Sequence, residues 1–265
     1  MNVGELRYIQ ALYEPAAGRN PDALVGAFVP MRRRLACAVR GMLLRSRLRA
    51  KPFYRYLLAR TRYYDAVFLD AVHGGVRRII NIGCGSDTRA YRFAHLLRRA
   101  GVAVLECDQP QAIRAKQEIA ERHWAVDHVS YVTLDLQARA WSALERPLNG
   151  EPVLVMLEGV SPYISTDSFE AFLRFLAGRL APRSVLAYDF KIAGTPEAPG
   201  VVQSMPRPFR LPAARKQVAG YHAALGFELE HMELSRDLCR RLAAGEAMTF
   251  DHDCLLRLRP GERSS

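Results

Sequence analysis

Residues 77–92 carry the spacing with the clearest chemical use in this chain. An apolar run ends in Gly83-Cys84-Gly85, and a polar turn through Asp87 and Thr88 leads into a helical pattern. Glycines at such a turn allow a nucleotide-like ligand to lie against bare backbone, and the N–H groups of the following helix point toward that ligand. Gly-x-Gly turns also occur in purely structural loops, so the residues after the later strands are needed to interpret this one.

Acidic residues stand at the ends of three later apolar runs, as Asp108, Asp135 and Glu158. In an open α/β sheet, ligands bind at the carboxyl ends of the strands, near the point where the strand order reverses. Asp108 lies ~20 residues after the glycine turn, where a carboxylate can grip two ribose hydroxyls. Helix N-capping explains any one of these acids but explains the series less well. The pattern therefore predicts a nucleoside-binding site.

The turn itself selects among nucleotides. A dinucleotide fingerprint requires a third glycine at position 88, which is Thr88 here, and Asp87 beside it would repel a pyrophosphate. No Gly-Lys-Ser/Thr P-loop occurs in the chain. S-adenosylmethionine carries no phosphate and has a cationic sulfonium, which an acid-lined pocket tolerates. We therefore expect S-adenosylmethionine, rather than NAD, as the cofactor.

The elements that must position these residues alternate between strands and helices. Residues 1–70 read as helices broken by prolines and glycines. Strands are then predicted at 76–82, 102–107, 129–134, 153–157 and 184–190, with helices at 87–100, 109–124, 138–145 and 167–181. This alternation predicts a parallel sheet covered by helices on both faces. Residues 227–234 and 254–258 predict an antiparallel closing pair, and the five prolines of 191–212 predict a long functional loop.

Composition excludes several classes of protein. The chain has 265 residues, enough for one large domain, and five cysteines without any CxxC spacing. A disulfide framework and a structural zinc site are therefore not expected, and a reducing cytoplasm fits best. No apolar run approaches the ~20 residues that a membrane helix needs, so we expect no membrane partner. The unpaired cysteine spacing also leads us to expect no metal.

The net charge of +11 is concentrated in one segment. Eleven arginines and lysines, all between positions 32 and 62, stand in a stretch without any acid from Asp22 to Asp65. The block is either a solvated helical face or a platform for an anionic partner: an acidic small molecule, a carrier protein or RNA. Few aromatic residues stand among the arginines, which disfavours stacking on single-stranded nucleic acid.

Four motifs in this order resemble the leucine carboxyl methyltransferase family, which includes bacterial O-methyltransferases of natural-product pathways. They are ARTRYYD at 59–65, NIGCGSDTRAYR at 81–92, ECDQP at 106–110 and LEGVSPY at 157–163. The resemblance covers residues 55–190 well, and residues 20–30 and the C-terminal third more loosely. It implies a Rossmann-like seven-stranded methyltransferase sheet over 71–265, with an N-terminal helical lid over 1–70.

The resemblance also implies roles at single positions. Arg60 would pair with the carboxylate of S-adenosylmethionine, Gly83 and Gly85 would lie under its methionine part, and Asp108 would hold its ribose. Asp135 and Leu136 would flank the adenine, Glu158 would lie near the donor's amino group, and Tyr163 would face the acceptor. The arginine-rich lid departs from the family pattern, which points to an acceptor unlike a protein C-terminus.

The expected reaction is O-methylation of a small, acidic metabolite, such as a natural-product intermediate that is free or held on a carrier protein. Positioning dominates methyl transfer. A carboxylate acceptor arrives ionised and needs only a cation to orient it, for which Arg62 is the candidate. A phenol needs a base, and the candidates are Tyr188, His73 and His222.

Two other functions remain open on the sequence. The arginines of 32–62 would serve an RNA methyltransferase, and a non-catalytic protein that binds S-adenosylmethionine would keep the same pocket. The sequence predicts no oligomeric state.

Overall fold

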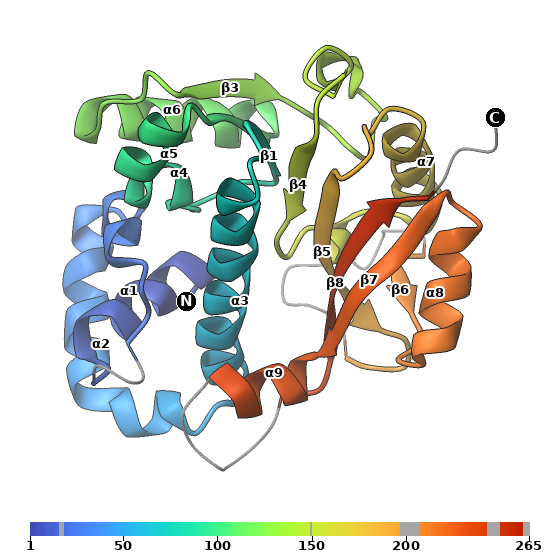
Figure 1. Cartoon of the computed structure of the whole chain (residues 1–265). Helices are drawn as coiled ribbons and strands as arrows, with labels where there is room; N and C mark the ends of the chain where they lie inside the picture. The colour runs from blue at the N-terminus through green and yellow to red at the C-terminus, as the bar shows by residue number, and fades with distance from the viewer. Residues whose placement is uncertain (16–18, 149, 197–206, 243–249, 262–265) are drawn as a thin grey trace.

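The computed structural model describes residues 1–15, 19–148, 150–196, 207–242 and 250–261, and a single mixed sheet forms its centre (Figure 1). Five parallel strands are β1 Arg78–Ile82, β2 Ala103–Asp108, β3 Val129–Thr133, β4 Val153–Leu157 and β5 Val185–Ile192. With β7 Phe227–Leu234 and β8 Asp253–Pro260, the order is β3-β2-β1-β4-β5-β8-β7. The short strand β6 Arg210–Leu211 pairs with β5 and brings the expected seven strands to eight.

The last two long strands confirm the predicted antiparallel closing pair. β8 runs antiparallel to both β5 and β7, so it lies between them and β7 forms the edge. The strand order reverses between β1 and β4, which is where an open α/β sheet binds its ligand.

Helices cover both faces of the sheet because successive strand residues point to opposite sides. Ile79 packs with α3 Pro52–His73, α5 Ala94–Ala100, α6 Pro110–His123 and α9 Ser235–Leu242. Its neighbour Ile80 packs on the other side with α7 Thr166–Ala177 and α8 Arg215–Ala223. The predicted three-layer α/β arrangement is therefore confirmed.

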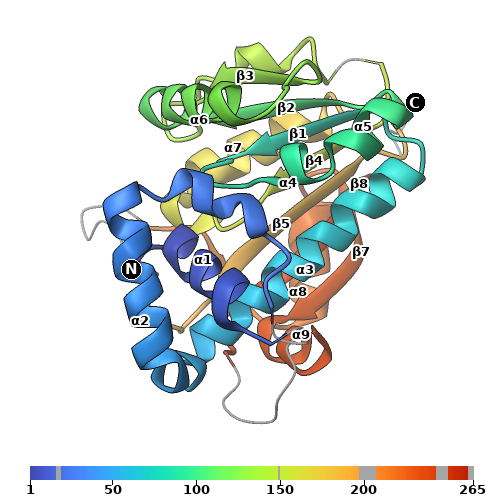
Figure 2. The ribbon, with the colours of Figure 1, turned by 90° about the vertical axis from the view of Figure 1, so that its left-hand side faces the viewer.

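The N-terminal helices form an outer group next to α3 (Figure 2). They are α1 Val3–Tyr13, the 3₁₀ helix η2 Ala23–Phe28 and α2 Met31–Arg49. Asn2 and Glu5 form a capping box at the start of α1. A Cβ added to Gly4 would lie 3.2 Å from Ser86 Oγ, so the first turn of α1 lies against the turn that follows β1.

Some predicted elements differ from the structure. In place of a helix over 138–145 there is a tight reversal, in which the Ala140 N–H donates to the Asp135 carbonyl, and then the 3₁₀ helix η3 Ser142–Leu144. The helix predicted over 87–100 is interrupted at Phe93 into α4 Arg89–Arg92 and α5. The predicted loop 191–212 begins in β5 and ends around β6, and its residues 197–206 lie outside the described part. Helices α8 and α9 were not predicted.

All five cysteines are buried and free. Among the described residues, no helix combines the length and the apolar character needed to cross a bilayer.

Candidate functional site

Two turns meet where the strand order reverses. Gly83-Cys84-Gly85 follows β1, and Glu158 and Gly159 follow the adjacent strand β4. Gly83 has φ +66°, and a Cβ there would overlap Val160 Cγ2. Only glycine fits at this position, because any side chain would have to adopt a left-handed conformation and displace Val160.

Asp108, at the end of β2, is tied to the glycine turn. The Gly85 N–H donates to Asp108 Oδ2 at 2.8 Å, and the Gln109 N–H donates to Oδ1 at 2.8 Å. The backbone carbonyl of Asp108 accepts from the Leu134 N–H, which links it to the end of β3. The two backbone N–H groups orient the Asp108 carboxylate. Because the residue is only half-buried, the remaining lone pairs of the carboxylate can accept from a ligand.

Asp135 and Leu136 follow β3. Asp135 is half-buried, and its Oδ1 accepts from the Ala138 N–H at 3.0 Å. The Leu136 side chain is buried in the apolar core between the sheet and α7. A ligand beside β3 would therefore meet the backbone of Leu136 rather than its side chain.

Arg60 of α3 reaches the turn after β4. Its Nε donates to Glu158 Oε1 at 3.2 Å, and its Nη1 lies 3.6 Å from Asp189 Oδ2 in β5. Burial alone would lower the pKa of Arg60, but Glu158 and Asp189 outweigh it and raise that pKa above its usual range. No described residue accepts a hydrogen bond from Nη2, so this edge of the guanidinium is available to an anionic ligand.

Glu158 is shared between two arginines. The fully buried Arg89 donates from Nη1 to Glu158 Oε2 at 2.8 Å, from the same atom to Asp87 Oδ2 at 2.5 Å, and from Nε to Asp65 Oδ1 at 2.8 Å. We call Asp65, Asp87, Arg89 and Glu158 the carboxylate cluster. Because three carboxylates surround one guanidinium, Arg89 fixes the orientation of Glu158.

The cluster corrects one step of the sequence argument. Asp87 was expected to repel phosphates as an anion in the pocket, but it is buried and its charge is paired with Arg89. Burial would raise the pKa of Asp87, yet the Arg89 guanidinium holds it well below its usual range. Selection against a pyrophosphate therefore does not come from a free Asp87 carboxylate.

Asp189 is a member of the site that the sequence analysis missed. Its Oδ1 accepts from Tyr64 Oη at 2.9 Å and from the Gly159 N–H at 2.6 Å. Burial raises its pKa to about 6, although Arg60 opposes the shift. The other acids were identified because each follows the end of a strand. Asp189 lies inside β5, so that criterion does not identify it.

The structure does not bring Arg62 to this site. Arg62 follows Arg60 by two helical positions, which turns it about 200° around α3. Its Nη1 donates to the carbonyl of Leu242 at 2.6 Å and its Nη2 to the carbonyl of Arg19 at 3.4 Å. These contacts link α3 to the end of α9 and to the segment after α1, away from Glu158.

The three base candidates also lie elsewhere. Tyr188 Oη and His222 Nε2 are 2.6 Å apart, and both residues are buried between β5 and α8. Burial lowers the pKa of His222 to about 4, so the imidazole is neutral. His73 is exposed at the end of α3 that leads into β1, so it lies at the amino ends of the parallel strands, opposite to the Glu158 turn.

Tyr163, the predicted acceptor contact, lies in the 3₁₀ helix η4 Ser161–Tyr163 just after the Glu158 turn. Its side chain is 40% exposed, so it can reach a second ligand. Partial burial raises the pKa of its phenol, and the Arg60 cation opposes this shift.

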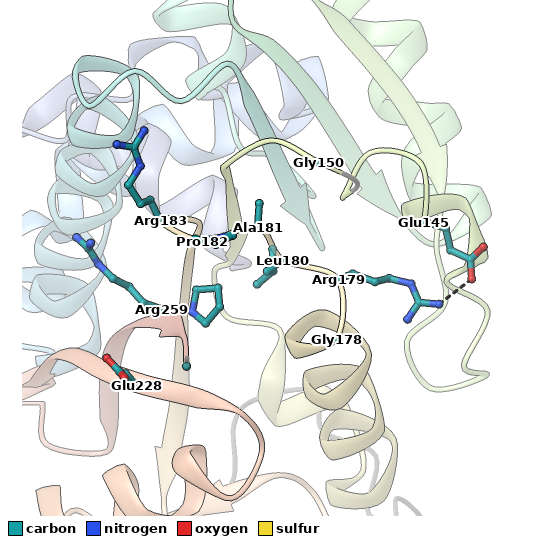
Figure 3. A pocket seen from close by; sticks show the side chains of 12 residues that line it. Glu145, Gly150, Gly178, Arg179, Leu180, Ala181, Pro182, Arg183, Glu228 and Arg259 are labelled. Atoms are coloured by element: carbon teal, nitrogen blue, oxygen red, sulfur yellow. Dashed lines mark hydrogen bonds and ion pairs between the residues drawn. The ribbon is translucent and has the colours of Figure 1, made fainter. Parts of the chain in front are cut away.

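A separate cavity opens at the amino ends of the parallel strands (Figure 3). It has a volume of about 810 Å³ and lies between the start of β5 and the end of β8, where Arg179 pairs with Glu145 at 3.1 Å. Because Ala181, Pro182 and Pro260 line it at the amino ends of the parallel strands, it does not belong to the constellation around Glu158.

The strand order reverses between β1 and β4, and we call this place the switch point. The residues around the switch point fit S-adenosylmethionine. The positive-φ glycine turn suits a methionine chain that lies on the backbone, and the backbone-oriented Asp108 carboxylate suits a ribose. The free guanidinium edge of Arg60 suits the methionine carboxylate, and the Glu158 carboxylate suits the amino group. Among the described residues, no three or more histidine, cysteine, aspartate or glutamate side chains form a group that could hold a metal ion.

Related proteins agree with this arrangement. The model of the leucine carboxyl methyltransferase family matches residues 22–177. A candidate S-adenosyl-L-methionine-dependent methyltransferase of Mycolicibacterium smegmatis is 31% identical over 138 residues, which cover 51% of this chain and 43% of that protein. One from Mycobacteroides abscessus is 33% identical over 165 residues, which cover 61% and 50%. The chain thus spans half or less of the length of these relatives.

Solved structures share the fold. That of a candidate methyltransferase from Thermobifida fusca covers 98% of this chain and 95% of its own, with a TM-score of 0.58 and 11% identity. The magnesium protoporphyrin IX methyltransferase of Synechocystis PCC 6803, solved with bound SAH, covers 78% and 86%, with a TM-score of 0.50 and 15% identity. At these identities the likeness concerns the fold alone. Because the family model matches more than half of its length, this chain belongs to the leucine carboxyl methyltransferase family, whose cofactor is S-adenosylmethionine.

Proposed function

We propose that the protein is an S-adenosylmethionine-dependent O-methyltransferase that acts on the carboxylate or hydroxyl of a small, acidic metabolite. The observation that carries the proposal is the link between Arg60 and Glu158 directly beside the Gly83–Gly85 turn and Asp108. This places one cation and two carboxylates around the point where the strand order reverses.

Several residues would hold the donor. Asp108 would accept from the ribose hydroxyls, and the free edge of Arg60 would pair with the methionine carboxylate. Gly83 and Gly85 would let the methionine part lie on the backbone, Glu158 would face its amino group, and Asp135 and Leu136 would flank the adenine. When bound, the donor supplies a methyl group already activated by its sulfonium, so the protein's contribution is to orient the two reactants.

The positions of the three base candidates favour an acceptor that arrives ionised. The candidate bases Tyr188 and His222 are buried, and His73 lies at the amino ends of the parallel strands, away from Glu158. A carboxylate needs no base, which supports carboxyl methylation over methylation of a phenol. Arg62 donates to the backbone carbonyls of Leu242 and Arg19, so we do not assign it the role of orienting the acceptor.

Asp108→Asn tests the donor site. The variant keeps an acceptor oxygen but loses the charge, so we expect the affinity for S-adenosylmethionine, measured by calorimetry, to fall by about ten-fold or more. Asp127→Asn is the matched control, because Asp127 is an exposed aspartate paired with Arg98 far from the switch point. It should leave the affinity unchanged.

Two results would reject the proposal. One is a wild-type protein that binds NAD in preference to S-adenosylmethionine, which would remove the donor. The other is donor binding without transfer of a labelled methyl group to any member of a panel of acidic metabolites, which would leave a binding protein rather than an enzyme.

A further inference from the structure

Helix α2 is packed with its large apolar side chains on the outside. Its buried positions are Cys37, Gly41 and Leu48, two of them small, and a Cβ on Gly41 would overlap the Tyr13 ring of α1. Small residues on this inner face allow α2 to lie close against α1. Apart from Leu48, the long apolar side chains of α2 therefore do not pack against the rest of the molecule.

Most of the strongly exposed apolar side chains of the described residues lie on this one helix. Six of nine belong to α2, namely Met31, Leu35, Val39, Met42, Leu43 and Leu44. Met31, Leu35 and Met42 are 75%, 71% and 66% exposed. At 3.6 residues per turn, all but Leu44 fall within an arc of about 120°, which makes a continuous stripe along α2. We call these five residues the α2 stripe.

Unpaired cations accompany the α2 stripe. Arg32, Arg40 and Arg47 are exposed, and within the described ranges their side chains form no hydrogen bond or ion pair. Arg32 lies inside the arc near the start of the helix, and Arg40 and Arg47 lie about 40–60° beyond the edge marked by Leu43. No acid occurs between Asp22 and Asp65, so nothing on α2 itself offsets their charge.

The shape of this surface separates the possible partners. α2 is a single helix at the outer side of the molecule, on the far side of α1 and α3 from the sheet (Figure 2). Its 19 residues span about 28 Å. An uncharged partner helix would cover the apolar stripe but leave the arginines unmatched. A convex apolar ridge with arginines beside it matches the plane of an anionic bilayer, where arginines reach phosphates and apolar side chains enter the acyl region.

We propose that α2 docks this protein onto the surface of a membrane that contains anionic lipids. The docking is peripheral, since no described helix can cross a bilayer. It revises the expectation from the sequence that no membrane is involved, because lying on a membrane and spanning it have different sequence signatures. The proposal does not depend on methyl transfer.

Sedimentation with vesicles tests the proposal on the full chain. We expect the protein to sediment with vesicles of phosphatidylcholine and phosphatidylglycerol, and to remain in solution with phosphatidylcholine alone. Each of Arg40→Gln and Arg47→Gln should lower the partition coefficient about five-fold. Arg99→Gln and Arg122→Gln replace exposed arginines on α5 and α6, and they should have no effect.

The apolar component is tested separately from the charge. Leu35→Asn combined with Leu43→Asn should lower binding about ten-fold or more, whereas Leu35→Met combined with Leu43→Met should retain it. Both positions are exposed, so neither pair disturbs the packing of α2 on α1.

Four outcomes would overturn the docking proposal. The first is no sedimentation with the anionic vesicles at low salt. The second is an equal loss of binding with the α5 and α6 arginine variants, which would indicate diffuse charge attraction. The third is a dimer in light scattering that the Leu35 and Leu43 pair dissociates, which would assign the α2 stripe to a second copy. The fourth is tight binding of RNA or an acidic protein that the α2 variants abolish while vesicles are ignored.

Discussion

The neutral His222 side chain makes the stability of the protein depend on pH. Burial lowers the pKa of His222 to about 4 from 6.5, and its Nδ1 lies 2.6 Å from the carbonyl of Val218. The unfolded chain therefore takes up a proton before the folded chain does. The contribution of neutral His222 to the free energy of unfolding is fully present above pH 6.5 and is lost as the pH falls toward about 4. The maximum loss is about 3 kcal/mol.

Urea unfolding at a series of pH values, compared between wild type and His222→Asn, measures this effect. Asp189, whose pKa is raised to about 6, changes stability in the opposite sense over part of the same window, so the difference between variant and wild type is the informative quantity. We expect the variant to be less stable at neutral pH and its stability to fall less with acid. The exposed His73→Asn variant should keep the wild-type slope; if it also flattens the curve, buried His222 is not the cause.

At the scale of elements, the β1 turn and the β4 turn are held together by the absence of a side chain at Gly83. Gly83→Ala would force φ +66° on alanine and push its Cβ into Val160. We expect a loss of about 3 kcal/mol or more in the free energy of unfolding, of which the conformation alone accounts for about 1–2 kcal/mol. Donor binding should fall with it, because Glu158 is two residues from Val160.

Two further variants separate strain from overlap. Gly101→Ala has almost the same φ, +63°, with nothing within 4 Å of the new Cβ, so it should cost only the conformational part. Combining Gly83→Ala with Val160→Ala should recover part of the loss, as measured by thermal unfolding and calorimetry. Equal costs at Gly83 and Gly101, with no recovery in the double variant, would mean that the two turns do not press on each other.

At the scale of the molecule, Arg89 joins parts of the chain that are far apart in sequence. It binds Asp65 of α3, Asp87 after β1 and Glu158 after β4. Helix α3 also shares its apolar core with the sheet. We therefore expect residues 1–70 and the sheet to unfold in one transition. The family resemblance, in contrast, implies a separate lid over residues 1–70.

Arg89→Met leaves three carboxylates around an uncharged side chain. We expect it to lower the free energy of unfolding by about 3–5 kcal/mol, because a buried charge without its partner is costly. Arg98→Met is the control, since its pair with Asp127 is exposed and should contribute about 0–1 kcal/mol. Differential scanning calorimetry gives both quantities. Two separate transitions in the wild type would support independent domains instead.

The sequence by itself determined the architecture, the family and the cofactor. Alternating apolar strands and helical patterns predicted all seven long strands to within two residues at each end. This works because strand and helix periodicities are local properties of the chain. The motifs at 81–92, 106–110 and 157–163 were enough to predict the family and S-adenosylmethionine, because glycine turns and acids after strands define the ligand at the switch point.

Only the tertiary structure decided how charges are paired and which side chains face outward. Arg60 and Arg62 look alike in sequence, yet the turn of α3 directs one to Glu158 and the other to backbone carbonyls. Asp87 reads as a free anion until Arg89 is seen to neutralise it. The arginine block reads equally as a solvated face or as a platform for an anionic partner, and only packing places Cys37 and Gly41 inward and the α2 stripe outward. Pairing and exposure depend on contacts between segments distant in the chain, which no local pattern records.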